Sequence, residues 1–199
     1  SASSGIGDST AAGDIDTTAT TLIASTATGG IYLTETDGVA IGATSTTTSG
    51  DIVIVAGNTL TTSGNVSTAG NGNISISTTT GAATISNTVT ANGSGDVTLS
   101  SAGLLTVNNV ISSTTGDLAL TGGTGVTHNA SGDLTTGGAG TIGVSATANA
   151  VTMADGTVYT AGGGAVTVTG ATNVVLGQIA KATGTVGVTA TGGAISDAT

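Results

Sequence analysis

Few residues in this chain carry side chains that could take part in catalysis or metal binding. His128 is the only imidazole and Lys181 the only strong cation. A serine nucleophile needs a neighbouring base and a transition-metal site needs several ligands, so one histidine builds neither alone. His128 also lies in an alternating apolar segment, at the position that Val107 and Met153 occupy in neighbouring repeats. We therefore expect an inward-facing core histidine without a bound metal and a chain that is not an enzyme; a metal-binding or catalytic role is the alternative.

Aspartates recur at one point of the repeated segment. Asp51, Asp96 and Asp117 each follow a glycine, and Asn73 stands at the equivalent place in the repeat between the first two. Asp and Asn are typical of turns because their side chains bond to nearby backbone. Asp96 and Asp117 belong to adjacent repeats, where charges about 5 Å apart in water repel by only roughly 0.8 kcal/mol. A turn role is the expectation, and a weak Ca²⁺ site between Asp96 and Asp117 is the alternative, with Ca²⁺ as the sole candidate cofactor.

The composition of the chain restricts its partners and its core. Eleven acidic residues against one basic residue leave a formal charge of −10, which excludes nucleic acids and anionic membranes as expected partners. No apolar run is long enough to insert into a membrane. The chain has no Pro, Cys, Trp or Phe. A core without large aromatic groups must be narrow and lined with small aliphatic side chains.

A strand-start pattern, Gly-x-aliphatic-x-aliphatic, recurs along the chain with a spacing of 20 to 24 residues. Alternation with a period of two places each aliphatic pair on one face of a β-strand. The pairs are Ile31/Leu33, Ile52/Ile54, Ile74/Ile76, Val97/Leu99, Leu118/Leu120, Ile142/Val144, Val166/Val168 and Val186/Val188.

Two shorter strands follow in each repeat. The expected inward residues of the second strand are Val39/Ile41, Leu60 alone, Ala83/Ile85, Leu105/Val107, Val126/His128, Val151/Met153 and Val174/Leu176. Those of the third strand are Val66, Val89, Ile111, Leu134, Val158 and Ile179. Gly, Asn, Asp, Ser and Thr between the strands are typical of turns.

This organisation predicts an all-β fold, a right-handed parallel β-helix (β-solenoid) of about eight coils of roughly 22 residues with three short strands per coil. An antiparallel sandwich is the rival, but it needs hairpin turns instead of one fixed period. We expect residues 1–199 to form a single solenoid segment of a longer repeat protein, with residues 1–28 as an irregular first coil. Register shifts are expected between Gly116 and Gly164, where the spacing reaches 24 residues.

Several segments resemble the repeat region of filamentous-haemagglutinin-type adhesins and giant bacterial surface repeat proteins. They are residues 5–7, 17–18, Leu22, residues 28–34 and 38–42, and the Ser/Thr-Gly-Asp-aliphatic starts at 49–52, 94–97 and 115–118. The resemblance implies export across the outer membrane of a bacterium, an extended β-helical shaft, and a role in adhesion or surface structure.

The expected function is therefore structural: a secreted or cell-surface solenoid that forms a filament, sheath or stalk. An adhesin shaft that presents a site for a host, cell or surface ligand is the alternative. An ice-binding or polysaccharide-binding β-helix is a minor alternative, because the densest threonine runs, 46–48 and 78–80, do not recur at one position of every repeat. The expected partners are further coils, as copies of the chain or its continuation, and carbohydrate or cell surfaces.

Overall fold

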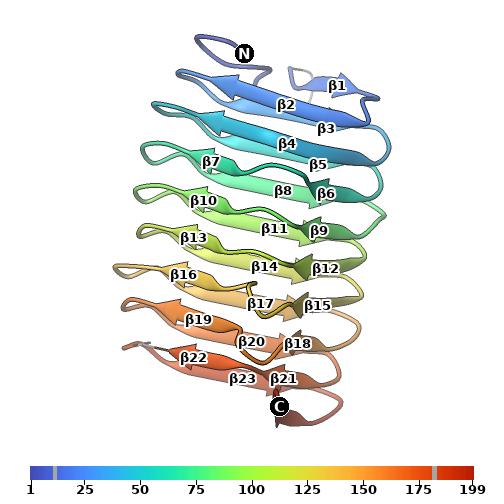
Figure 1. Cartoon of the computed structure of the whole chain (residues 1–199), viewed down its shortest axis with the longest axis vertical. Helices are drawn as coiled ribbons and strands as arrows, with labels where there is room; N and C mark the ends of the chain where they lie inside the picture. Colours follow the sequence, from blue (N-terminus) through green and yellow to red (C-terminus); the bar gives the residue numbers. More distant parts are fainter. Residues whose placement is uncertain (11–12, 181–182) are drawn as a thin grey trace.

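The computed structural model describes residues 1–10, 13–180 and 183–199, and these fold into a stack of β-coils (Figure 1). All strand pairs are parallel, and each strand within the stack pairs with the equivalent strand of the coil before and after it, while terminal strands pair on one side only. The predicted parallel β-solenoid, with its repeat of roughly 22 residues, is confirmed.

The first strands of the coils form one nine-stranded sheet, the first-strand sheet. It contains β1 (Ile15–Thr17), β3 (Ile31–Glu35), β5 (Ile52–Ala56), β8 (Ile74–Thr78), β11 (Val97–Ser101), β14 (Leu118–Gly122), β17 (Ile142–Ala146), β20 (Val166–Gly170) and β23 (Val186–Ala190).

The second and third strands together form the other sheet. The second strands are β6 (Leu60–Thr62), β9 (Ala83–Ile85), β12 (Leu104–Val107), β15 (Gly125–His128), β18 (Val151–Met153), β21 (Val174–Leu176) and β24 (Ile195–Asp197). The third strands are β7 (Val66–Thr68), β10 (Val89–Ala91), β13 (Ile111–Ser113), β16 (Leu134–Thr136), β19 (Val158–Ala161) and β22 (Gln178–Ala180). The long strands β2 (Thr21–Thr26) and β4 (Val39–Thr46) replace both, and β4 pairs with β6 and with β7. The coil is therefore flattened, with its second and third strands end to end.

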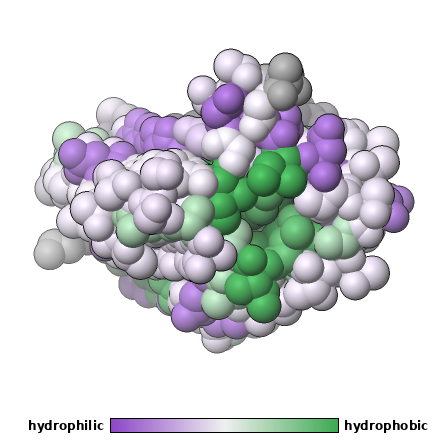
Figure 2. All heavy atoms as spheres, turned by 90° about the horizontal axis from the view of Figure 1, so that it is seen from above, coloured by the Kyte–Doolittle hydropathy of each residue, from purple (hydrophilic) through white to green (hydrophobic). Residues whose placement is uncertain are grey.

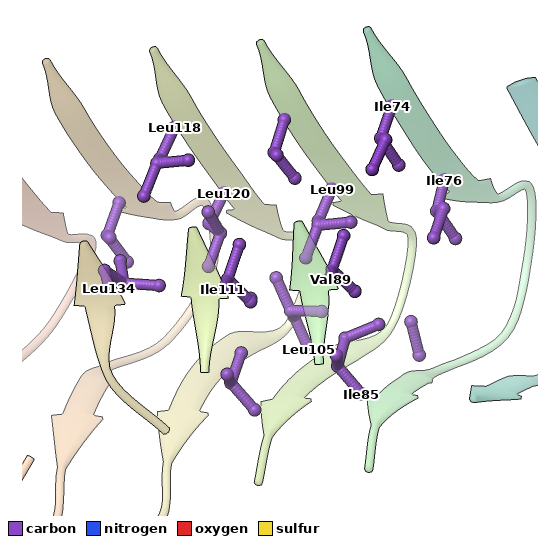
Figure 3. Packing of buried hydrophobic residues seen from close by; sticks show 14 of the residues in the cluster. Ile74, Ile76, Ile85, Val89, Leu99, Leu105, Ile111, Leu118, Leu120 and Leu134 are labelled. Carbon is purple, nitrogen blue, oxygen red and sulfur yellow. The ribbon is translucent and has the colours of Figure 1, made fainter. Parts of the chain in front are cut away.

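The core is a column of small aliphatic side chains between the two sheets (Figure 3). The predicted first-strand pairs from Ile31/Leu33 to Val166/Val168 are buried and stack in register. The last pair belongs to the terminal coil, so Val186 is 50% exposed. In β6, for which the sequence predicts Leu60 as the one inward residue, Thr62 is a second inward residue. Thr62 is buried, and its hydroxyl accepts hydrogen bonds from the amides of Ser86 and Asn87.

One predicted core residue is wrong. Tyr159, not Val158, occupies the inward position of β19, where it pairs with Leu134 and is fully buried. Six positions separate Met153 from Tyr159, the same number that separates His128 from Leu134. In these two coils the turn between the second and third strands is longer. The first inward residue of β19 is therefore Tyr159, one position after Val158.

The extra residues of these coils do not disturb the first-strand sheet. The sequence predicted register shifts between Gly116 and Gly164, but Leu118 pairs with Ile142 and Ile142 with Val166 without a shift. The added residues lie instead in the turns 129–133 and 154–157, which correspond to the three-residue turns 86–88 and 108–110. Turns on the surface absorb length more easily than a sheet whose residues must alternate between core and solvent.

The glycines that open the first strands form a column, the glycine corner, in which the backbones of successive coils come too close for a side chain. A Cβ atom on Gly72 would lie 2.1 Å from the carbonyl oxygen of Gly50, and one on Gly95 would lie 2.1 Å from that of Gly72. Buried hydroxyls bond to the same carbonyls: Thr68 donates to Gly72 at 2.7 Å and Ser113 to Gly95 at 2.6 Å. The repeat thus needs glycine so that the backbones of successive coils can approach closely. It also needs a nearby Thr or Ser whose hydroxyl donates a hydrogen bond to the glycine carbonyl.

Candidate functional surfaces

The recurring aspartates form a ladder along one corner of the solenoid. Each side-chain oxygen accepts a hydrogen bond from the backbone amide of the equivalent residue in the next coil. Asp51 accepts from Asn73 at 2.7 Å, Asn73 from Asp96 at 2.9 Å, Asp96 from Asp117 at 2.8 Å and Asp117 from Thr141 at 2.7 Å. The ladder satisfies amides at the turn that would otherwise need water, which gives these residues a structural role.

Asp96 and Asp117 lie in adjacent coils, at the equivalent positions that the sequence indicated. Each is exposed and holds one backbone amide through a carboxylate oxygen. In residues 1–10, 13–180 and 183–199, no cluster of three or more His, Cys, Asp or Glu side chains could hold a metal ion. Ca²⁺ binding by this pair stays a prediction.

His128 points into the core from β15, stacked between Val107 and Met153 as the sequence predicted. Its Nδ1 lies 2.7 Å from the carbonyl oxygen of Gly132, so this nitrogen carries the proton and donates. Burial lowers the pKa of His128 to about 4, against the smaller opposing effects of the Gly132 hydrogen bond and the charge of Asp133. The ring is therefore neutral at physiological pH.

Tyr159 packs edge-on against the His128 ring, with ring centroids 5.2 Å apart. The Tyr159 hydroxyl and His128 Nε2 are both buried and have no hydrogen-bond partner within the described residues. Burial raises the pKa of Tyr159 well above its ordinary value. This pair places two polar atoms without a partner among the described residues in a mostly aliphatic core. Lys181, the predicted sole cation, lies outside the described residues.

Glu35 is a third buried ionisable group, which the sequence did not single out. It extends inward from the end of β3 and accepts hydrogen bonds from the Thr17 hydroxyl and, at 2.9 Å, from the Ala19 amide. Burial opposes ionisation of Glu35, but hydrogen bonds, above all those from Thr17 and Ala19, outweigh it and hold the pKa of this carboxyl below its ordinary value. The charged carboxylate thereby ties the turn after β1 to the second coil.

The outer face of the second and third strands carries two ladders of hydroxyl groups. Thr61, Thr84, Thr106, Thr127 and Thr152 stack in register at the centres of second strands. Ser25, Ser45, Ser67, Thr90, Ser112, Thr135 and Thr160 do so at the centres of third strands or their equivalents. The dense threonine runs 46–48 and 78–80 are not part of either ladder. The regular arrays consist of single hydroxyls spaced one coil apart, which no run of threonines in the sequence indicates.

A pocket lies on the outer face of the first-strand sheet near the N-terminus. Its volume is about 210 Å³, and its lining includes Asp8, Asp14, Tyr32, Val53 and Val55. None of these side chains was identified from the sequence as a site residue. The signal that could have revealed them is one outward-facing Tyr and two outward-facing Val in a sheet whose other strands carry small or hydroxylated outward residues.

Both ends of the stack leave core side chains uncovered. Val186 in β23 and Ile195 in β24 are 50% and 51% exposed, although their counterparts one coil earlier, Val166 and Val174, are fully buried. β23 and β24 are the last strands in the order of their sheets. At the other end, Ile15 is 43% exposed, and hydrophobic atoms gather at the centre of the end face (Figure 2).

These features define the chain as a repeat protein with a parallel β-solenoid fold. Comparisons with protein-family models, curated protein sequences and solved structures find no match. The described residues include no helix with the length and apolar character of a membrane span.

Proposed function

We propose that this chain is a segment of an extended β-solenoid shaft outside the cell, where it serves as the building material of a filament, sheath or stalk. The observation that carries the proposal is the in-register stacking of the coils together with the uncovered core at both ends. In a solenoid, each coil gains stability from the coils on either side, so a terminal coil with an open core favours further stacking.

Composition supports an extracellular location. An acidic chain without cysteine needs neither a reducing compartment nor disulfides, and its repeat resembles that of filamentous-haemagglutinin-type surface proteins. The coils that continue the stack are either copies of this chain or further parts of the same polypeptide. Backbone pairing across a whole coil would outweigh the repulsion between the acidic ends, which salt screens beyond about 8 Å.

Sedimentation or light scattering of the purified chain at several concentrations tests stacking between copies. We expect association that increases with concentration and is reduced by Val186→Asp, which places a charge in the open end. Leu104→Asp is the matched control, because Leu104 is 40% exposed but lies on β12 in the middle of the stack. A monodisperse 18.3 kDa monomer at high concentration and moderate salt would rule out stacking between copies.

The hydroxyl ladders favour a second candidate function, binding to ice or to a polysaccharide surface. Thr61, Thr84 and Thr106 repeat at the coil spacing of about 4.8 Å. The residues at the centres of these strands are uncharged. A regular uncharged array can match a periodic ligand. Thr106→Lys would interrupt the array, so it should abolish inhibition of ice recrystallisation or adsorption to insoluble polysaccharide. Absence of both activities in the unsubstituted chain would refute this candidate.

A further inference from the structure

The first coil contains an insertion that interrupts the repeat at one place. Ile6 pairs with Ile31, and Ile15 pairs with Leu33. Ile31 and Leu33 are two positions apart, whereas Ile6 and Ile15 are nine positions apart. The first coil therefore has seven more residues at this point than the coil stacked on it. Insertions in repeat proteins frequently form binding surfaces, since the stacked core does not constrain their sequence.

Four residues of the insertion, Asp8, Ser9, Thr10 and Asp14, line the pocket on the outer face of the first-strand sheet. The sheet contributes Tyr32 and Thr34 from β3 and Val53 and Val55 from β5. From β8 onward, the outward positions of this sheet are Ser75, Ser77, Thr98, Ser100, Ala119, Thr121, Gly143, Ser145, Thr167, Thr169, Gly187 and Thr189. The aromatic and the bulky aliphatic outward residues of the sheet are thus concentrated at the insertion.

Hydrogen bonds fix both carboxylates at the rim of this pocket. Asp8 Oδ1 accepts from the Thr10 amide at 2.8 Å and from the Thr10 hydroxyl at 2.6 Å, and Asp14 accepts from the Thr34 hydroxyl. An ionised carboxylate has room for about four hydrogen bonds, so both keep acceptor capacity for a ligand. The pKa of Tyr32 is raised by burial and by the negative charges of Asp51 and Asp8, in accord with a negative potential at the pocket.

The acidic lining of the pocket favours a positively charged ligand. The whole chain has a single Lys or Arg against eleven acidic residues, so its own side chains offer almost nothing to neutralise the pocket. An ammonium group supplies three donors for carboxylates and is attracted to the face of an aromatic ring, while a methylene stem packs on valine. The volume of about 210 Å³ is below the roughly 300–1,000 Å³ of pockets that enclose whole small-molecule ligands, so one side chain is a better match.

We propose that this pocket binds the aminoalkyl side chain of a lysine on a partner protein, with the ammonium between Asp8 and Asp14 and the stem against Tyr32, Val53 and Val55. A partner protein is favoured over a free amine because contacts around the lysine add to those of so small a pocket. The pocket is formed within one chain and does not depend on stacking between copies. Failure of end-to-end association would therefore leave it intact.

An NMR titration of the ¹⁵N-labelled chain tests the proposal. The probe is Gly-Gly-Lys-Gly-Gly blocked at both termini, and the control peptide carries norleucine, which lacks the ammonium, in place of lysine. We expect amide shifts at Tyr32, Thr34, Val53 and Val55 with the lysine peptide and none with the norleucine peptide. n-Butylamine should bind more weakly than the lysine peptide, and galactose should cause no shifts.

Asp14→Asn keeps an oxygen for Thr34 but removes the charge, and it should weaken binding about fivefold, as expected for one exposed ion pair. Asp155→Asn is the matched control, since it removes the same charge from an exposed turn remote in sequence. Asp8→Asn repeats the test if Asp14→Asn does not fold. Equal weakening by Asp155→Asn, shifts with the norleucine peptide, butylamine as tight as the peptide, or pocket shifts with galactose alone would each overturn the proposal.

Discussion

The glycine corner allows a direct test of how closely the coils stack, with Gly95→Ala as the perturbation. A Cβ atom at this position would lie 2.1 Å from the Gly72 carbonyl oxygen, whereas ordinary van der Waals contact begins at 3.4 Å. Gly95 is not among the glycines with positive φ, so the cost comes from the contact and not from the backbone conformation. The two coils would have to separate by about 1.3 Å at this corner.

Such a separation would break hydrogen bonds that join these two coils beside the corner. The Asp96 amide donates to Asn73 Oδ1 at 2.9 Å, and the Asp96 carbonyl oxygen accepts from the Ile74 amide at 2.8 Å. Two hydrogen bonds contribute about 1 kcal/mol each, and overpacking without separation costs about 1–3 kcal/mol. We therefore expect Gly95→Ala to lower the free energy of unfolding by about 2–3 kcal/mol.

Urea unfolding followed by circular dichroism measures this loss, and Gly143→Ala is the matched control. Gly143 faces outward on β17, and the nearest atom to an added Cβ, the Leu118 carbonyl oxygen, is 3.9 Å away. Alanine there should raise stability by about 0.4–1 kcal/mol, because it restricts the unfolded chain. Equal unfolding midpoints for the two variants would refute the steric explanation of the glycine repeat.

Three further predictions concern buried or laddered polar groups. Because the pKa of His128 is about 4 in the fold against an ordinary 6.5, the unfolded chain binds the proton first. The free energy of unfolding should therefore fall by on the order of 3 kcal/mol as the pH drops from 6.5 to 4. The urea midpoint of His128→Leu should not show this part of the pH dependence. Tyr159→Phe removes a buried hydroxyl without a partner among the described residues, so it should raise stability by about 1 kcal/mol; a lower melting temperature would contradict this. Asp117→Asn keeps an acceptor for Thr141 and should change stability by less than about 0.5 kcal/mol, whereas Asp117→Ala should cost about 1 kcal/mol. A Ca²⁺-dependent rise in melting temperature that Asp117→Asn abolishes would instead support the metal site.

The sequence predicts the core of this protein well because the coil repeats one physical requirement. Each first strand must bury two aliphatic side chains on one face, so the pattern from Ile31/Leu33 to Val186/Val188 identifies both the strands and their register. The third strand is harder to predict from the sequence. A turn of variable length precedes it, and only the distance from Met153 distinguishes Tyr159 from Val158 as the inward residue.

The surface features could not be predicted because they depend on what lies side by side. Asp8 and Tyr32 are far apart in sequence, and the pairing of Ile6 with Ile31 is what brings the insertion over β3. Likewise, the hydroxyl ladders consist of isolated residues such as Thr84 and Thr106, which become an array only when the coils are in register. A search for runs of threonine instead finds the ends of β4 and β8 and the turns that follow them.

The direction of the backbone hydrogen bonds has a mechanical consequence. They connect successive coils along the long axis of the rod, so tension on that axis acts on one terminal coil at a time (Figure 1). Each coil of roughly 22 residues would release about 70 Å of extended chain while shortening the folded rod by only about 4.8 Å. Under tension, such a shaft would extend many-fold in steps before any covalent bond is strained. Single-molecule stretching should show this as a series of nearly equal steps, one for each coil.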